Sequence, residues 1–195
     1  MINGMKQREL LDFLSRLEKL KSNGRHSVTS DGVCETVAAH SWRLAVMALL
    51  LLPEFPDIDG DKLIRMCLIH DFGEAVTGDI PSFLKTNENE ATEGSAVHAL
   101  IGTLPEPQRG ELTALFEEMD ALETKEARLY KALDKMEAVI QHNESDISTW
   151  IPLEYELNQT YGVDSAAEFP YLRRLRALMI EDTKKKIDAV KEETL

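Results

Sequence analysis

Apolar residues recur with the period of an α-helix along nearly the whole of this 195-residue chain. In the first segment Leu10, Leu14 and Leu17 follow one another at helical spacing, with polar residues between them. No convincing run alternates between apolar and polar residues, as a half-buried strand would. The pattern therefore predicts an all-α fold, a bundle of helices that bury their apolar faces against one another.

Interruptions of this pattern predict where the helices end. Asn23-Gly24 stops the first helix, and Pro53 closes a second, very apolar helix over residues 35–52. A buried third helix should end near His70, and an ordered loop should follow over residues 72–86. We expect further helices at about 88–102, 106–119 and 123–142, a short segment at 150–159, and a last helix from about residue 165 with Pro170 in an early turn.

Charge and cysteine content exclude several classes of protein. The chain has 35 acidic and 22 basic residues, a formal net charge of −13, which argues against a general nucleic-acid binder and against attraction to an anionic membrane. The longest apolar run, residues 44–52, is too short to span a bilayer, and the N-terminus lacks the pattern of a signal peptide. Cys34 and Cys67 are predicted to be reduced core residues. We therefore expect a cytoplasmic protein.

Polar groups interrupt three of the predicted core helices. His40 lies in the apolar run VAAHSWRLAV, His70-Asp71 ends the buried third helix, and Asp134 lies beside the apolar stripe of the helix over residues 123–142. A buried charge without a partner is costly, and a divalent cation is one way to compensate it. Two imidazoles and two carboxylates suit Mn, Co, Fe, Ni, Zn or Mg. Spacing alone leaves open that these are polar groups satisfied by other core residues.

These four residues stand in the order H…HD…D, which resembles the pattern of the HD-domain metal-dependent phosphohydrolases. Three segments extend the resemblance: ETVAAHSWRLAVMALLL, IRMCLIHDFGEAVTGDIP and LYKALDKMEAVIQ. They are similar to the motif blocks of the 5′-deoxynucleotidase branch of that family. The family fold is an all-α bundle. The resemblance implies that residues 1–195 form a single HD domain, with the motif core at about 10–141 and helices at about 148–195 packing on it.

The resemblance also implies roles for individual residues. The candidate ligands His40, His70, Asp71 and Asp134 match the metal ligands of the family. Glu74 and Asp79, in HDFGEAVTGDIP, match its catalytic carboxylates. The residues implied to bind substrate are Arg25, which matches an arginine that orients phosphate, and His26, Asp79, Ile80, Pro81, Ser82 and Lys85.

The implied activity is hydrolysis of nucleoside 5′-monophosphates, above all deoxynucleotides, to nucleoside and phosphate. One divalent ion would activate a bound water, while Glu74 and Asp79 would manage the protons. If the third helix continues through residue 74, Glu74 lies one turn from His70 on the same face. The partners implied are a small-molecule nucleotide and further copies of the chain, in a dimer or a larger homo-oligomer. Two alternatives stay open: an HD-type hydrolase of nucleoside triphosphates or cyclic nucleotides, and a non-catalytic metal-binding interaction protein.

Two positions depart from the family pattern. Ala39 precedes His40 where the nucleotidases often have Glu, and His26 stands where the bacterial enzymes have Trp. An imidazole is smaller than an indole, so the sequence leaves open the choice between deoxyribose and ribose. His98 and His142 fall outside the pattern and are predicted to be non-catalytic. Core positions are predicted for Trp42, Met47, Met66 and Met136.

Overall fold

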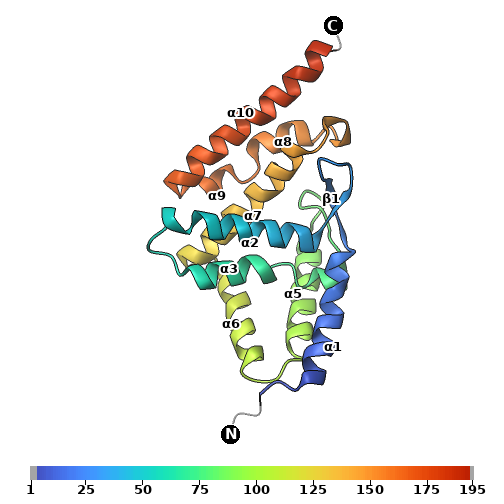
Figure 1. The fold of residues 1–195 in the computed structure, drawn as a ribbon, viewed down its shortest axis with the longest axis vertical. Helices are drawn as coiled ribbons and strands as arrows, with labels where there is room; N and C mark the ends of the chain where they lie inside the picture. The colour runs from blue at the N-terminus through green and yellow to red at the C-terminus, as the bar shows by residue number, and fades with distance from the viewer. Residues whose placement is uncertain (1–3, 194–195) are drawn as a thin grey trace.

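A computed structural model describes residues 4–193 and is predominantly helical, so the predicted all-α class is confirmed (Figure 1). Three 3₁₀ turns, at Glu18–Lys21, Leu52–Glu54 and Ile147–Thr149, and one small hairpin join the helices. The elements are α1 (Gln7–Leu17), β1 (Gly24–Val28), β2 (Cys34–Thr36), α2 (Val37–Leu51), α3 (Gly60–Ile69), α4 (Glu74–Thr77), α5 (Asn87–Ile101), α6 (Gln108–Ala121), α7 (Lys125–Glu144), α8 (Glu154–Thr160), α9 (Val163–Ala167) and α10 (Pro170–Glu193).

Helices α2, α3 and α7 pack against one another at the centre of the molecule (Figure 1). Leu44, Leu63 and Leu133, one from each of these helices, have no exposed surface. By length and composition alone, residues Val37–Glu54 could cross a membrane. In the fold, however, one side of α2 lies against α3 and α7, so its apolar character is accounted for by the core.

Side-chain caps set where the central helices begin, and therefore which residues reach the centre. The Thr36 hydroxyl accepts a hydrogen bond from the backbone N–H of Ala39, at the start of α2. The Asp59 carboxylate accepts one from Lys62 at the start of α3. These starts place His40 in the first turns of α2 and leave His70 as the residue that closes α3.

The predicted last helix is in fact two helices, which corrects the expectation of a continuous helix from about residue 165. Residues Val163–Ala167 form α9, and Pro170 opens α10 instead of lying inside an earlier turn. Proline lacks an N–H and restricts the residue before it, so the first helical position suits it best. α10 packs on α7, α8 and α9, and its buried Arg176 donates hydrogen bonds to the backbone carbonyls of Asn158 and Tyr161.

The hairpin was not predicted. Strands β1 and β2 are antiparallel, with Gly24 opposite Thr36 and Val28 opposite Cys34. Gly32, in the turn between them, has a φ of 78°, a left-handed conformation that glycine adopts without strain. The strands are too short to show an alternating pattern, but Asp31-Gly32 is a turn signal that could have revealed them.

Two side chains expected in the core lie at the surface. Cys34 is exposed on β2, whereas Cys67 is buried as expected, and both thiols are free. Trp42 is 63% exposed because it lies on the side of α2 that faces away from α3 and α7, while Met66 and Met136 are fully buried and Met47 packs at the edge of the core. An almost uniformly apolar helix does not reveal from sequence which of its sides faces the core.

Candidate metal centre and adjoining cavity

The side chains of His40, His70, Asp71 and Asp134 converge from α2, the end of α3 and α7. The Nε2 atoms of His40 and His70 are 3.3 Å apart. Asp134 Oδ1 lies 3.1 Å from His40 Nε2, and Asp71 Oδ2 lies 2.9 Å from His70 Nε2. Residues 94 positions apart in the sequence thus contribute to one cluster, because α2 and α7 pack side by side.

The other ring nitrogens show that this cluster fits a divalent cation. Nδ1 of His70 lies 3.0 Å from the carbonyl oxygen of Cys67, and Nδ1 of His40 contacts the carboxylate of Glu137. A carbonyl or carboxylate oxygen accepts a hydrogen bond, so both Nδ1 atoms carry a proton, and the two Nε2 atoms that face the cluster are left to bind a cation. A divalent cation bound there would neutralise the charge of the two carboxylates that face the same Nε2 atoms.

Electrostatics at the cluster points the same way. Burial opposes ionisation of Asp134, yet Lys131, whose ammonium is 2.9 Å from Oδ2, and His40 hold the pKa of Asp134 well below its usual range. Burial and the nearby Arg25 lower the pKa of His40, but hydrogen bonds with Asp134 and Glu137 outweigh them and raise it to about 10. Without a cation, a proton must therefore occupy this position, and a cation that binds there displaces it.

Sequence reasoning missed the residues that support the cluster from behind. The Glu137 carboxylate contacts His40 and accepts a hydrogen bond of 2.6 Å from Arg43 Nε. Glu35 holds Arg25 through a 2.8 Å ion pair and accepts a 2.6 Å hydrogen bond from Ser27. A charged residue three positions after Asp134, within the buried face of α7, was the one available signal for Glu137.

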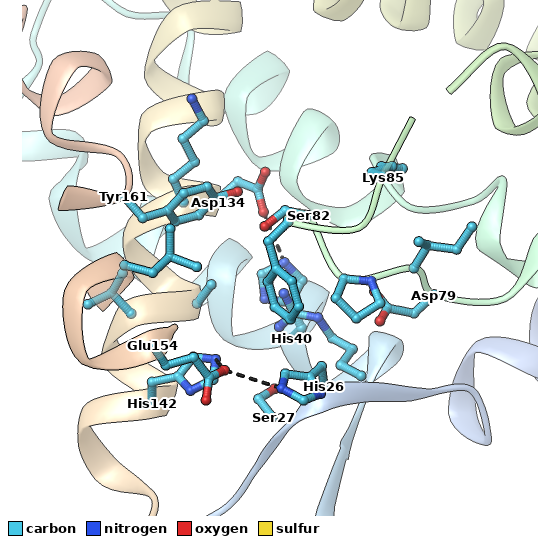
Figure 2. A pocket seen from close by; sticks show the side chains of 18 of the residues that line it. His26, Ser27, His40, Asp79, Ser82, Lys85, Asp134, His142, Glu154 and Tyr161 are labelled. Carbon is cyan, nitrogen blue, oxygen red and sulfur yellow. Dashed lines mark hydrogen bonds and ion pairs between the residues drawn. The ribbon is translucent and has the colours of Figure 1, made fainter. Parts of the chain in front are cut away.

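A cavity of about 450 Å³ opens beside the cluster (Figure 2). His40, Asp71 and Asp134 lie on its wall, whereas His70 faces a second cavity of about 360 Å³. Asp71, Lys85 and Lys131 line both cavities. All the residues predicted to bind substrate or act in catalysis line the first cavity: Arg25, His26, Glu74, Asp79, Ile80, Pro81, Ser82 and Lys85.

Glu74 reaches the site by a different path from the one expected. α3 ends at Ile69 and the chain turns, so Glu74 begins the separate short helix α4 rather than continuing α3. Its side chain is buried, its Oε2 makes no hydrogen bond to any described residue, and its carboxylate lies close to those of Asp71 and Glu93. Burial, with the charges of Asp71 and Asp79, raises the pKa of Glu74 to about 9.

The two cations predicted to meet phosphate are both engaged by carboxylates. Lys85 forms a 2.5 Å ion pair with Glu93, and Arg25 lies between Glu35 and Glu137. Arg25 is mostly buried but lines the cavity. A guanidinium has five N–H donors, so Arg25 keeps donors for a ligand after it has bonded to Glu35.

Residues outside the family pattern complete the opposite side of the cavity. His142, predicted to be non-catalytic, lines this wall together with Glu154, and Figure 2 shows both beside His26. Burial, together with the neighbouring His26 and Arg25, lowers the pKa of His142 to about 4. No sequence pattern indicates a role for Glu154, because its side chain reaches the cavity only through the way α8 packs beside His142.

Comparisons with known proteins identify relatives of this chain. A family model described as HD domain matches residues 17–173. The 5′-deoxynucleotidase HDDC2 of Bos taurus is 33% identical over 147 residues, which cover 73% of this chain and 71% of that protein. The human HDDC2 is 32% identical over 146 residues, with the same coverage. A crystal structure of a "Predicted metal-dependent phosphohydrolase" from Magnetospirillum magnetotacticum has a TM-score of 0.77 at 27% identity, and covers 92% of this chain and 93% of that one.

The family model covers most of the chain, including the helices that carry the clustered histidines and aspartates. The relatives match about seven tenths of their own length. The chain therefore belongs to the HD-domain family of metal-dependent phosphohydrolases, and its sequence is similar to those of the 5′-deoxynucleotidases in that family.

Proposed function

We propose that this protein hydrolyses 2′-deoxynucleoside 5′-monophosphates to a nucleoside and inorganic phosphate. The observation that carries the proposal is the convergence of His40, Asp71 and Asp134 on the wall of a cavity that Arg25 also lines. A volume of about 450 Å³ lies in the range of cavities that hold small ligands. The activity named for the relatives in cattle and humans supports the same substrate class.

The proposed metal ligands are His40, His70, Asp71 and Asp134, which would hold one divalent ion. When bound, such an ion neutralises charge on the phosphoryl oxygens and acidifies a coordinated water. The protein would position the phosphate against it through Arg25, whose forked N–H groups suit two phosphate oxygens at once.

Glu74 and Asp79 are proposed to carry the protons of the reaction. Hydrolysis forms a bond from a water oxygen to phosphorus and breaks the bond from phosphorus to the 5′ oxygen, so one proton leaves the water and the 5′ oxygen gains one. A buried carboxyl group with a raised pKa, as at Glu74, can hold a proton at neutral pH and transfer it. Burial also raises the pKa of Asp79, on the same cavity wall.

The proposal also includes the localisation and the assembly of the protein. Two free cysteines, one of them exposed, suit the reducing cytoplasm. Trp42, Leu49 and Leu50 expose apolar surface on α2, which a second copy of the chain would cover in a homo-oligomer. Light scattering tests the assembly: a particle of 22.0 kDa, the mass of one chain, would contradict it.

The direct test is release of inorganic phosphate from a panel of 2′-deoxynucleoside and ribonucleoside 5′-monophosphates, with Mn²⁺, Co²⁺ or Mg²⁺ added. We expect turnover of the deoxynucleotides and its loss on chelation. In the Asp71→Ala variant, bound metal and turnover should be lost together, while circular dichroism shows the helices intact. A metal-loaded protein that releases phosphate from no nucleotide would refute the proposal.

A further inference from the structure

One helix, α7, runs along the cavity from the metal cluster to its far end. Asp134, Ala138 and His142 succeed one another at intervals of four residues, so they share a face, and all three line the cavity. The eight residues from Asp134 to His142 span about 12 Å of helix. That is the scale of a nucleotide from its phosphate to the outer edge of its base. A phosphate at the cluster therefore places the base near His142.

Apolar and aromatic side chains also line the cavity. Ala138, Val139 and Leu157 line it, and the His26 ring meets the Phe83 ring edge to face, with centroids 5.4 Å apart. Figure 2 shows His142 and Glu154 across the cavity from Asp79 and Lys85, with His26 facing them. Such surroundings suit a flat heteroaromatic ring, since binding cavities combine apolar walls with a few placed polar groups.

Two buried polar atoms of α8 make no hydrogen bond to any described residue: Oε1 of Glu154 and Nδ2 of Asn158. Their side chains are 1% and 2% exposed, and both line the cavity. The Nε2 atoms of His26 and His142 lie 3.3 and 3.4 Å from Glu154 Oε1, at ion-pair distance. A buried donor or acceptor without a bond destabilises a fold, so these two atoms point to a ligand that supplies the missing groups.

The rest of α8 is arranged to keep these two atoms in place. Glu154 and Asn158 are four residues apart and share one face of the helix. The other carboxylate oxygen of Glu154 accepts a 2.7 Å hydrogen bond from the Ile151 backbone N–H, which leaves Oε1 for the cavity. Arg176 of α10 fixes the far end of α8 by donating to the carbonyls of Asn158 and Tyr161.

We infer that Glu154 and Asn158 form a subsite for 4-amino and 6-amino nucleobases, an inference that rests on the proposed function for placing a nucleotide in this cavity. Glu154 Oε1 accepts a hydrogen bond from the exocyclic amino group of cytosine or adenine. Asn158 Nδ2 donates one to the adjacent ring nitrogen, N3 of cytosine or N1 of adenine. Guanine and thymine carry a carbonyl oxygen at the position of that amino group, where a carboxylate repels it.

Nucleosides test the subsite without any need for hydrolysis, because they lack the phosphate. Isothermal titration calorimetry on the full chain compares 2′-deoxycytidine and 2′-deoxyadenosine with the analogues that lack only the exocyclic amino group, pyrimidin-2-one 2′-deoxyriboside and purine 2′-deoxyriboside. We expect the amino compounds to bind about tenfold more tightly, the effect of one hydrogen bond to a charged group. Thymidine should bind no better than the analogues.

Two variants assign the preference to named atoms. Glu154→Gln replaces the free acceptor by a donor and keeps an oxygen for Ile151, and Asn158→Asp replaces the donor by an acceptor. Both should erase the tenfold preference. Glu156→Gln and Gln159→Glu make the same two exchanges on α8 at positions that do not line the cavity, and they should preserve it.

Equal affinity of the wild-type protein for amino and des-amino nucleosides, or binding of none of them, would overturn the inference even if the variants misfold. An amino preference that survives in both Glu154→Gln and Asn158→Asp would also overturn it. Failure of the proposed function would look different. In that case no deoxynucleotide would release phosphate, while the preference for amino nucleosides would remain.

Discussion

His40 turns Nε2 toward the cluster because its other ring nitrogen faces Glu137. The same carboxylate accepts a hydrogen bond from Arg43, and Arg25 Nη1 lies 3.6 Å away, so Glu137 is fixed from several directions. Burial opposes its ionisation, but His40, Arg25 and Arg43 together lower the pKa of Glu137. An ionised partner behind a ligating imidazole fixes its tautomer and raises its basicity.

Glu137→Gln should therefore weaken metal binding about 10- to 100-fold, because the amide orients His40 less strongly than a carboxylate does. Competition of Mn²⁺ binding against a chelator measures this change. Glu144→Gln is the matched control, since Glu144 also pairs with Arg43 but is half exposed and does not contact His40. Equal affinities in wild type and Glu137→Gln would show that Glu137 does not support the centre.

His142 should make the protein sensitive to mild acid. Its pKa is about 4 in the folded chain and about 6.5 in the unfolded chain. The unfolded chain therefore binds the proton first, so stability is complete above about pH 6.5 and is lost as the pH falls toward 4. Between pH 7 and pH 5 the loss should be about 2 kcal/mol.

Urea unfolding at the two pH values, with a chelator present so that metal release does not contribute, measures this loss. His142→Gln cannot take up the proton and should lose about 2 kcal/mol less than wild type over the same interval. If both proteins lose the same free energy of unfolding, the buried imidazole is not the cause.

At the scale of single residues, the sequence identified the histidines and aspartates that the structure brings together. Their role as metal ligands stays a prediction. Histidines and aspartates in apolar runs stand out because a buried polar group needs a partner. Glu137 could have been noticed for the same reason. Glu154 could not, because its importance depends on where α8 packs, and no local pattern encodes that contact.

The short helix α4 connects the cluster of candidate metal ligands to the predicted substrate segment, and α4 ends at Gly78. Gly78 has φ 76° and ψ 165°, a conformation essentially restricted to glycine. A Cβ built there would meet no atom within 4 Å, so the constraint comes from the backbone alone. The turn directs Asp79, the next residue, into the cavity.

Gly78→Ala should cost about 1–3 kcal/mol of stability through backbone strain, and it should lower kcat because Asp79 shifts. Gly94 is the matched control: a Cβ there also meets no atom within 4 Å, but Gly94 lies inside α5. Gly94→Ala should stabilise the protein by about 0.5–1 kcal/mol, as alanine does in helices. Thermal unfolding and phosphate release measure both effects. Equal stability of Gly78→Ala and wild type would contradict the strain.

The bounds of a helix can be predicted closely where a proline or a polar residue marks its end, and elements without such a residue escape prediction. The break at Pro53 and the polar pair at His70-Asp71 predicted the ends of α2 and α3 to within one residue. The hairpin was too short for its periodicity to register. In α1 the leucine pattern indicated a helix correctly, yet Leu10 and Leu14 are exposed and Phe13 faces the core instead. Periodicity identifies a helix more securely than the face it buries.

At the scale of the whole molecule, α7 packs against elements from both the N-terminal and the C-terminal parts of the chain. It carries Asp134 at the cluster of candidate ligands and also packs against α9 and α10. Because the C-terminal helices pack on the helix that holds a candidate ligand, we propose that residues 1–195 act as a single domain. Within the described residues, α9 packs on α7, and α10 packs on α7, α8 and α9.

Heating should therefore give one unfolding transition, the same by far-UV circular dichroism and by tryptophan fluorescence. The candidate ligands converge only in the folded chain, so Mn²⁺ at 100 times its dissociation constant should add about 2.7 kcal/mol and shift the whole transition upward. Two separate transitions, or a shift seen by one probe alone, would contradict the single domain.

The central claim is that His40, His70, Asp71 and Asp134 hold one divalent cation. Anomalous diffraction from a crystal of the protein grown with Mn²⁺ tests it most directly. The account predicts one strong anomalous peak bounded by the two Nε2 atoms and by carboxylate oxygens of both aspartates. A Mn²⁺-containing crystal with no peak between these four side chains would contradict it.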